Sequence, residues 1–143
     1  MKPTSSQPAT QYAAVCYRHT APGACEVLLI TSLDTGRWVL PKGWPKKGET
    51  GGDSAMREAY EEAGVVGRLR EGCLGVYGYD KILASDLARP CCVAVHVIAV
   101  SHLDFAFPEK GLRTREWFAP DIAAGLVDEP ELKRLLESFS PEA

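Results

Sequence analysis

Three glutamates in the middle of the chain have the spacing that metal-binding or catalytic carboxylates need. Glu58, Glu61 and Glu62 stand at positions i, i+3 and i+4, which lie on one face of an α-helix. Like charges at this spacing destabilise a helix by about 0.2 to 0.5 kcal/mol per pair. Arg57 is placed to pair with Glu61, four residues on, but it cannot neutralise all three carboxylates. A hard divalent cation would do so, since Mg2+ and Mn2+ prefer oxygen ligands; the alternative is an ordinary solvated helix face.

The residues around these glutamates predict the helix that must carry them. Apolar side chains recur at the 3-4 spacing of a buried stripe: Ala55, Met56, Ala59, Tyr60 and Ala63. Thr50, with Asp53 three residues later, resembles a capping box, and Gly64 stands where a left-handed C-terminal cap is expected. The pattern predicts a helix over residues 51–63, with the three glutamates on the face opposite to its buried stripe.

Together with the residues before it, the glutamate helix resembles the Nudix box. The matching residues are, in chain order, Gly43, Glu49, Arg57-Glu58-Ala59, Glu61-Glu62 and Gly64-Val65. Membership of this family implies an α/β fold, an α/β/α sandwich with a mixed β-sheet. It also implies that a loop-helix-loop motif carries out metal-dependent cleavage of a diphosphate linked to another group.

Two short segments outside the box narrow the resemblance. The stretch Trp38-Val-Leu-Pro-Lys-Gly43 is similar to the start of the box in dinucleoside-polyphosphate hydrolases and in some diphosphoinositol-polyphosphate phosphohydrolases. The stretch Arg115-Glu-Trp-Phe118 is similar to the C-terminal segment of the second group. Lys46 and Lys47 depart from that group, in which acidic residues often stand at these positions.

The resemblance implies a role for each residue of the box. Glu58 and Glu62 correspond to metal ligands. The carbonyl of Gly43 is a further candidate ligand, because a residue without a side chain lets the backbone approach an ion. Glu61 is the candidate general base.

Glu49 and Arg57 match positions that pair with each other and fix the loop against the helix. This pairing competes with the contact between Arg57 and Glu61 that helix spacing also allows. A carboxylate that binds both ends of the guanidinium suits its geometry, so the Glu49 pairing is predicted, which leaves Glu61 free for chemistry.

Phosphates distant from the metal need cationic partners. The candidates flank the start of the box and a late strand: Arg37, Lys42, Arg113 and Arg115. Arg37 and Arg115 match cationic positions in the diphosphoinositol enzymes, and Arg113 and Arg115 are expected to point to one side of their strand. Trp44, in the loop, is the candidate for stacking on a base. Plain surface charge is the alternative for each cation.

Composition excludes several other classes of protein. The chain has 143 residues, a net charge of -3 and a pI near 5.6, which does not indicate a broad nucleic-acid-binding surface. Its five cysteines, without a C-x-x-C pair, predict buried reduced thiols rather than a zinc site or a disulfide framework. No apolar run is long enough to span a bilayer and no signal-type segment is seen. A cytoplasmic protein without a membrane partner, monomeric or homodimeric, is expected.

The rest of the chain predicts one folded unit. A flexible tail is expected over residues 1–10 and a single domain over residues 11–143. Strands are predicted over 11–18, 25–31, 37–40, 90–100 and 113–118, interrupted extended chain over 65–79, a polar loop over 80–89, and helices over 121–126 and 131–139. Strands mixed with helices favour an α/β sandwich.

The leading functional hypothesis is a Mg2+-dependent hydrolase, with Mn2+ able to substitute, acting on a small-molecule substrate. The substrates expected from the resemblance are dinucleoside polyphosphates or similarly phosphate-rich diphosphates of the diphosphoinositol polyphosphate type. A second hypothesis is a nucleoside-triphosphate or RNA 5'-end pyrophosphohydrolase. A third, from another class, is a non-catalytic Nudix module that senses a nucleotide. The chain retains all the box glutamates, which favours the enzymes.

Overall fold

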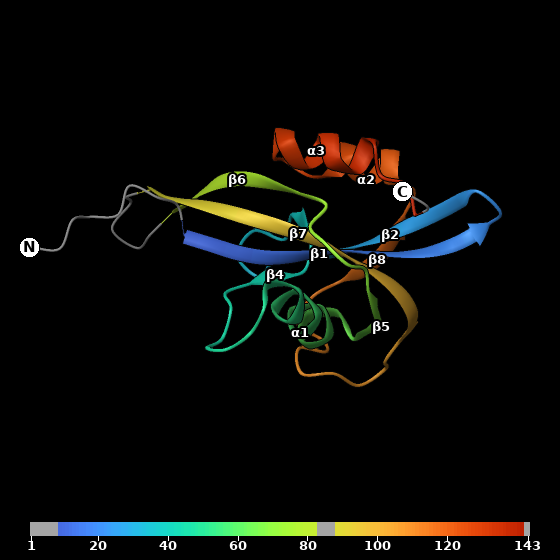
Figure 1. Cartoon of the computed structure of the whole chain (residues 1–143), viewed down its shortest axis with the longest axis horizontal. Coiled ribbons are helices and arrows are strands. Elements are labelled where there is room, and N and C mark those ends of the chain that lie inside the picture. The colour runs from blue at the N-terminus through green and yellow to red at the C-terminus, as the bar shows by residue number, and fades with distance from the viewer. Residues whose placement is uncertain (1–8, 83–87, 142–143) are drawn as a thin grey trace, which may run out of the picture.

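The protein is built on one eight-stranded β-sheet, which crosses the middle of Figure 1. The computed structural model describes residues 9–82 and 88–141. The strands are β1 (Ala9–Ala21), β2 (Ala24–Thr31), β3 (Trp38–Val39), β4 (Lys42–Gly43), β5 (Val65–Leu69), β6 (Gly75–Ile82), β7 (Ala88–Leu103) and β8 (Arg115–Phe118). β1 and β7 run parallel and the other pairs among these strands are antiparallel, so the expected mixed sheet is confirmed.

Helices cover both faces of the sheet. α1 (Gly51–Ala63) lies on one face, and α2 (Pro120–Leu126) and α3 (Pro130–Glu137) lie together on the other (Figure 1). Each helix layer has its own apolar core, because side chains alternate between the two faces of a strand. The core under α1 includes Ala14, Leu28, Ile30, Ala55, Ala59, Ala63 and Ile98. The core under α2 and α3 includes Val15, Leu29, Val95, Ala123, Leu132 and Leu136. The expected α/β/α sandwich is confirmed.

The helix α1 begins and ends as the sequence predicts. The Thr50 hydroxyl accepts a hydrogen bond from the backbone N–H of Asp53 at 3.1 Å, and Gly64 ends the helix in the left-handed conformation with φ of 71°. The predicted buried stripe is formed by the three alanines, which allow the helix to lie close to the sheet. Tyr60 was expected in this stripe and is instead 37% exposed, because it lies at the edge of the packed face.

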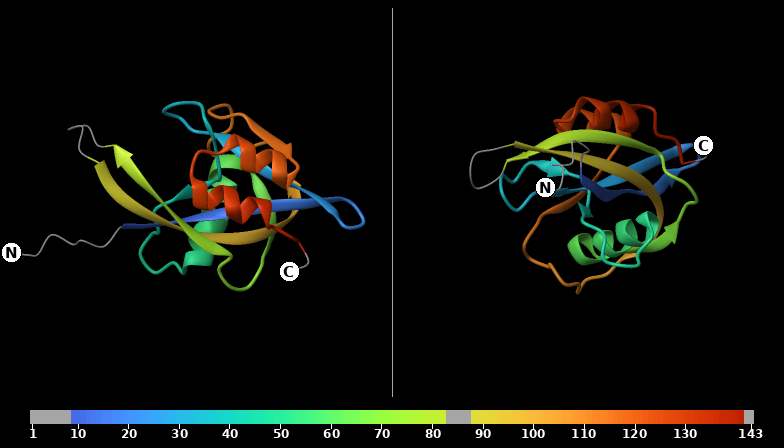
Figure 2. Two further views of the ribbon diagram at one scale, coloured as in Figure 1. Left: turned by 90° about the horizontal axis from the view of Figure 1, so that it is seen from above. Right: turned by 60° about the vertical axis from the view of Figure 1, so that its left-hand side comes forward.

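The central strand pair positions the start of the glutamate motif. β1 and β7 pair over nine positions, from Ala9 with Cys91 to Tyr17 with Ala99. The short strand β4 pairs with the same strand β1, which places Gly43 opposite Tyr12. α1 contacts both β1 and β4, and Figure 2 shows the loop after β4 running alongside α1. The sheet therefore holds the loop and the helix in one place, although seven residues separate Gly43 from the start of α1.

Two predicted boundaries were wrong. Residues 1–8 of the expected tail lie outside the described residues, but Ala9 and Thr10 already belong to β1, because they pair with β7. Within the expected polar loop over 80–89, the residues Asp80–Ile82 continue β6 and Ala88 begins β7, because these strands pair as far as Ile82 with Ala88. Residues 83–87 of that loop lie outside the described residues.

The five cysteines are free thiols, as expected. Cys16 and Cys91 are buried, but Cys73 is exposed, contrary to the prediction of buried thiols, because it precedes β6 in a surface turn. Within residues 9–82 and 88–141, no helix has the length and apolar character needed to cross a membrane.

The N-terminal cap of α1 provides the first testable prediction. Replacing Thr50 by Ala leaves the backbone N–H of Asp53 without its side-chain acceptor, so the free energy of unfolding should fall by about 1 kcal/mol. Urea denaturation of the wild type, Thr50→Ala and Thr50→Ser measures this. Thr50→Ser retains the hydroxyl and should remain within about 0.5 kcal/mol of the wild type. Equal stabilities of the Ala and Ser variants would show that the hydroxyl does not stabilise the helix.

Candidate active site

Arg57 ties the loop that precedes α1 to the helix. Its Nε donates to Oε2 of Glu49 at 2.6 Å and one Nη donates to Oε1 of the same carboxylate at 3.0 Å, which is the predicted two-point contact. The same Nη also donates to the carbonyl of Trp44 at 3.0 Å. The hydrogen bond from Arg57, aided by one from the backbone N–H of Lys46, lowers the pKa of Glu49 to about 2. The loop is therefore held by an ionised carboxylate at physiological pH.

The other Nη of Arg57 contacts two of the three helix glutamates. It donates to Oε2 of Glu58 at 3.0 Å and to Oε1 of Glu61 at 3.1 Å. The prediction that the Glu49 pairing would exclude the Glu61 pairing was wrong, because the planar guanidinium has five N–H groups and serves both sides. Arg57 thus fixes the positions of two carboxylates as well as the loop.

Glu62 is buried, contrary to the expectation that all three glutamates would share an outward face. Its Oε1 accepts a hydrogen bond from the backbone N–H of Lys42 at 3.2 Å, and its Oε2 lies 3.6 Å from Arg113. Burial raises the pKa of Glu62, and the nearby carboxyl of Glu58 raises it further, whereas Arg113 opposes the shift. Two carboxyl groups are therefore close together where little water reaches one of them, and a cation would relieve both the burial and the repulsion.

Gly43 lies directly against the carboxyl group of Glu58. A Cβ atom placed on Gly43 would come within 2.2 Å of Oε2 of Glu58, so only glycine leaves room here for the carboxylate. Glu58 and Glu62 thus bring carboxylate oxygens, the ligands that Mg2+ and Mn2+ prefer, against the backbone of β4, whose Gly43 carbonyl stays a predicted further ligand. Among the described residues, no three His, Cys, Asp or Glu side chains are grouped closely enough to hold a metal by themselves. A metal in this place would depend on backbone or substrate oxygens as well.

Two adjoining cavities open beside these carboxylates. The carboxylate cavity, of about 190 Å3, is lined by Ser32, Leu33, Asp34, Val39, Leu40, Lys42, Glu62 and Arg113. The side bay, of about 300 Å3, is lined by Ser32, Asp34, Thr35, Arg37, Val39, Lys42, Tyr79 and Asp80. Lys42 lines both, and its Nζ lies 5.0 Å from the centre of the Tyr79 ring.

The four predicted phosphate-binding cations are placed very differently. Lys42 and Arg113 line the carboxylate cavity, where Arg113 is also bonded to Glu109 at 3.0 Å and to the carbonyl of Thr31 at 3.2 Å. Arg37 lines the side bay, but its guanidinium donates to Glu129, the residue before α3, at 2.8 Å. The structure therefore brings two of the four predicted cations to the carboxylates.

Arg115 lies at the C-terminal end of α1, and the structure does not support its predicted contact with a phosphate. Its Nη1 donates to the carbonyl of Ala63 at 2.6 Å and to that of Asp104 at 3.0 Å, and the guanidinium stacks on the ring of Phe107. Arg113 precedes β8, so the predicted strand over 113–118 began too early, although both arginines contact residues of α1. Arg115 satisfies the carbonyl of Ala63, which the helix end leaves open. Its contact with the Ala63 carbonyl stabilises the C-terminal end of α1.

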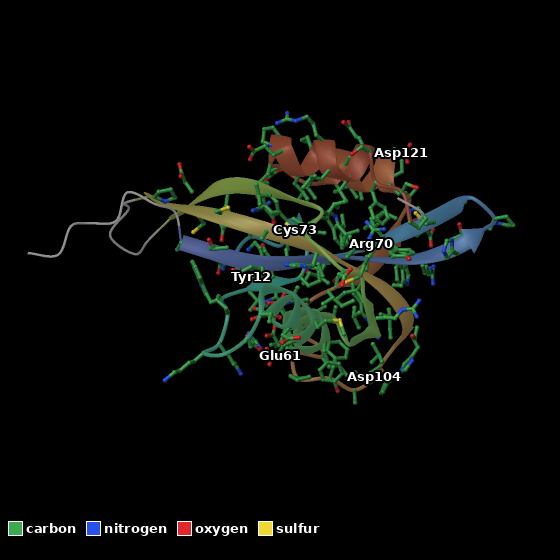
Figure 3. All side chains as sticks on the ribbon, in the orientation of Figure 1. Tyr12, Glu61, Arg70, Cys73, Asp104 and Asp121 are labelled. Atoms are coloured by element: carbon green, nitrogen blue, oxygen red, sulfur yellow. The ribbon has the colours of Figure 1, made fainter. Side chains whose placement is uncertain are left out.

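Figure 3 shows Glu61 on the outer side of α1, across the sheet from Asp121 of α2. Trp44 is 37% exposed in the loop that Arg57 holds, so its stacking role stays a prediction.

The sequence did not predict Ser32, Asp34 and Tyr79 as cavity residues. Tyr79 is brought there by the pairing of β6 with β7, for which the local pattern gives no signal.

Known proteins resemble this chain in sequence and in fold. The NUDIX domain profile matches residues 9–139. Nudix hydrolase 13, mitochondrial, of Arabidopsis thaliana is 33% identical over 120 residues, covering 80% of this chain and 59% of that protein. Diphosphoinositol polyphosphate phosphohydrolase 3-beta of Homo sapiens is 36% identical over 114 residues, covering 78% of this chain and 64% of that protein. A crystal structure of C. elegans Ap4A hydrolase has a TM-score of 0.64 and 22% identity, covering 92% of this chain and 95% of that one.

The fold and the site define an α/β/α domain in which a loop and a helix present carboxylates beside a cavity. The chain belongs to the NUDIX domain family, and the matched range contains the whole motif from Gly43 to Val65. The chain spans between about half and two thirds of the length of curated relatives that it matches (53% to 65%). The likeness to the C. elegans enzyme shows that the two share a fold.

The close contact at Gly43 yields a prediction about metal binding. In Gly43→Ala the carboxylate of Glu58 must move aside, which a flexible side chain can do at little cost in stability, but it then leaves the donor set. The dissociation constant for Mg2+, measured by calorimetric titration, should rise about tenfold or more. Gly125→Ala, in α2, where an added Cβ meets nothing within 4 Å and the helical backbone accepts any side chain, is the control for a glycine-to-alanine change away from the site. Unchanged Mg2+ binding in Gly43→Ala would show that this carboxylate is not a ligand.

The placement of Arg115 predicts an effect on stability rather than on substrate choice. Arg115→Ala leaves the carbonyl of Ala63 without its donor, so the free energy of unfolding should fall by about 1 to 3 kcal/mol. Any change in kcat/KM should be the same for substrates with short and long phosphate chains. Arg68→Ala, at an exposed position of β5, is the control in urea denaturation. A loss confined to long-chain substrates, with stability unchanged, would restore the phosphate-binding role.

Proposed function

We propose that the chain is a Mg2+-dependent hydrolase that cleaves a phosphoanhydride bond in a small-molecule substrate, with Mn2+ able to replace Mg2+. The observation that carries this proposal is the contact of the Glu58 carboxyl with Gly43, beside the buried carboxyl of Glu62. These oxygen donors suit a hard divalent cation. Nudix hydrolases generally use divalent metal ions, which supports the same assignment.

The residues around this donor set would each have a separate role in hydrolysis. A bound cation would offset phosphate charge and make an attacking water more acidic. Glu61 is 30% exposed at the edge of the donor set, so its carboxylate is accessible to take the proton from that water. Arg57 orients Glu61 through its hydrogen bond at 3.1 Å. Lys42 and Arg113, which line the carboxylate cavity, would bind the phosphates next to the bond that is cleaved.

For the substrate we propose a dinucleoside polyphosphate or a related phosphate-rich diphosphate. The name of the human relative refers to diphosphoinositol polyphosphates, and the structural neighbour is an Ap4A hydrolase. Two cations in the carboxylate cavity suit a chain of phosphates, and Trp44 in the adjacent loop offers a ring for stacking on a base. A nucleoside-triphosphate or RNA 5'-end pyrophosphohydrolase and a nucleotide-sensing module remain the alternatives. Hydrolysis of none of these compounds, together with binding of one, would select the module.

The localisation, oligomeric state and partners that we propose are those expected from the sequence. We propose a cytoplasmic protein, monomeric or homodimeric, with no nucleic-acid or membrane partner. The net charge of -3 supports the absence of a broad nucleic-acid surface. Size-exclusion chromatography with light scattering measures the oligomeric state directly.

The dependence on metal is directly testable. Hydrolysis of diadenosine tetraphosphate should disappear in excess chelator and return on addition of Mg2+ or Mn2+. Glu62→Gln should lower kcat/KM about 100-fold or more, since even a residue that only supports a metal ligand is worth about 10- to 100-fold. The variant should remain folded, because the amide oxygen still accepts from the N–H of Lys42 and no longer places a charge in a buried position.

Glu71→Gln, which removes an exposed carboxylate before β6, is the matched control and should behave like the wild type. Circular dichroism of all three proteins checks that they are folded. Full turnover in excess chelator, or full turnover of a folded Glu62→Gln variant, would disprove the metal-dependent mechanism.

A further inference from the structure

The side bay contains a cation that is already paired within the protein. Nη2 of Arg37 donates to Oε2 of Glu129 at 2.8 Å, and Nη1 lies 3.6 Å from Asp128. Both acidic residues belong to the segment that joins α2 to α3, 92 positions further along the chain in the case of Glu129. Both ends of the guanidinium are therefore directed at the helix layer, on the other face of the sheet from α1.

Burial makes this ion pair persistent. The Glu129 side chain is only 9% exposed, and that of Arg37 is 31% exposed. The partners Glu129 and Asp128 raise the pKa of Arg37, although burial opposes this. Separating the pair would leave the carboxylate of Glu129 buried without a counter-ion, which is costly. Arg37 therefore has little tendency to leave Glu129 for a ligand in the bay.

Because Glu129 neutralises the charge of Arg37, the side bay has little positive charge with which to bind a polyanion. Arg37 and Lys42 face two carboxylates in its lining, Asp34 and Asp80, so the described charges of the bay balance. Binding of many phosphates requires an excess of Arg and Lys side chains over carboxylates. Carboxylates, in contrast, are good acceptors for hydroxyl groups, such as those of a sugar.

We propose that Glu129 is a specificity-determining residue, which holds Arg37 so that the side bay accepts a hydroxyl-bearing part of the substrate and disfavours additional phosphates. This inference rests on the proposed hydrolase function and narrows its substrate class. The phosphates of the substrate then bind in the carboxylate cavity, beside Lys42 and Arg113, and phosphates beyond those that this cavity holds gain no further partner in the side bay. Glu129 acts through Arg37 and does not itself touch the substrate.

The experiment uses substrates that differ only in the number of phosphates. The values of kcat/KM for diadenosine diphosphate, triphosphate, tetraphosphate and pentaphosphate are measured in Mg2+ with the full chain. In the wild type they should not rise from the tetraphosphate to the pentaphosphate, because the side bay has no excess of cations for the added phosphate. In Glu129→Gln the guanidinium of Arg37 loses its buried counter-charge and keeps only a neutral acceptor, so it can bind phosphate. The ratio of pentaphosphate to diphosphate activity should then rise about tenfold, as expected for one added charge-assisted contact. The change should appear mainly in KM.

Three further variants make the test decisive. Asp128→Asn removes the exposed, more distant acidic partner and should shift the same ratio in the same direction but less. Arg37→Gln should leave the ratio within about twofold of the wild type, because the guanidinium does not contact phosphate in the native protein. Glu137→Gln, at the exposed end of α3, is the control and should change nothing. Thermal unfolding is followed for each variant, and if Glu129→Gln does not fold, Asp128→Asn and Arg37→Gln still decide.

The possible failures are distinguishable. A selective loss on the longer chains in Arg37→Gln would overturn the inference, because it would show that Arg37 binds phosphate in the native protein. A wild type that prefers the pentaphosphate over the tetraphosphate would overturn it as well. An unchanged ratio in a folded Glu129→Gln would do the same. Absence of hydrolysis of every compound by the wild type would instead count against the proposed hydrolase function.

Discussion

The structure of the site depends on one guanidinium group. Arg57 binds Glu49 at two points, the carbonyl of Trp44 in the loop, and two glutamates on its own helix. A lysine could not make these contacts, because an ammonium group has three donors on a single atom, whereas the guanidinium spreads five over a plane. Loop and helix are thereby one rigid unit, which is the condition for holding oxygen donors at fixed distances from one another.

Beside this rigid unit, the carboxyl group of Glu62 is buried. Glu62 lies under β4, where desolvation raises its pKa, and it is accommodated by the backbone N–H of Lys42 and by Arg113. A buried carboxyl without such partners would destabilise the fold considerably. The free-energy cost of burying this carboxyl group therefore stays small as long as the N–H of Lys42 and the guanidinium of Arg113 remain in contact with it. A cation would lower that cost further, so metal binding and local order are expected to reinforce each other.

The parts of the site that are local in sequence were predictable, and the parts that depend on pairing between distant segments were not. The limits of α1 and its two caps follow from spacings of fewer than ten residues, and the contact of Glu49 with Arg57 was implied by the resemblance to the Nudix box. The burial of Glu62 depends on β4 lying over the helix, and the sequence of the helix alone does not predict this arrangement. The same is true of the fold: the strands were recognisable as apolar runs, but the long parallel pairing of β1 with β7 was not.

The arginines show why a cation found by resemblance need not bind substrate. Charge and position along the chain are readable from sequence, but a guanidinium is available to a ligand only if nothing in the protein already occupies it. Arg37 and Arg115 have the expected type and place, yet Arg37 is paired with Glu129. Arg115 is bonded to backbone carbonyls at the end of α1 and just after β7. Both partners arise from tertiary packing. The groups proposed to hold the metal are local in sequence, whereas those proposed to hold the rest of the substrate are distant. Related chains can therefore share the chemistry of hydrolysis while differing in what they hydrolyse.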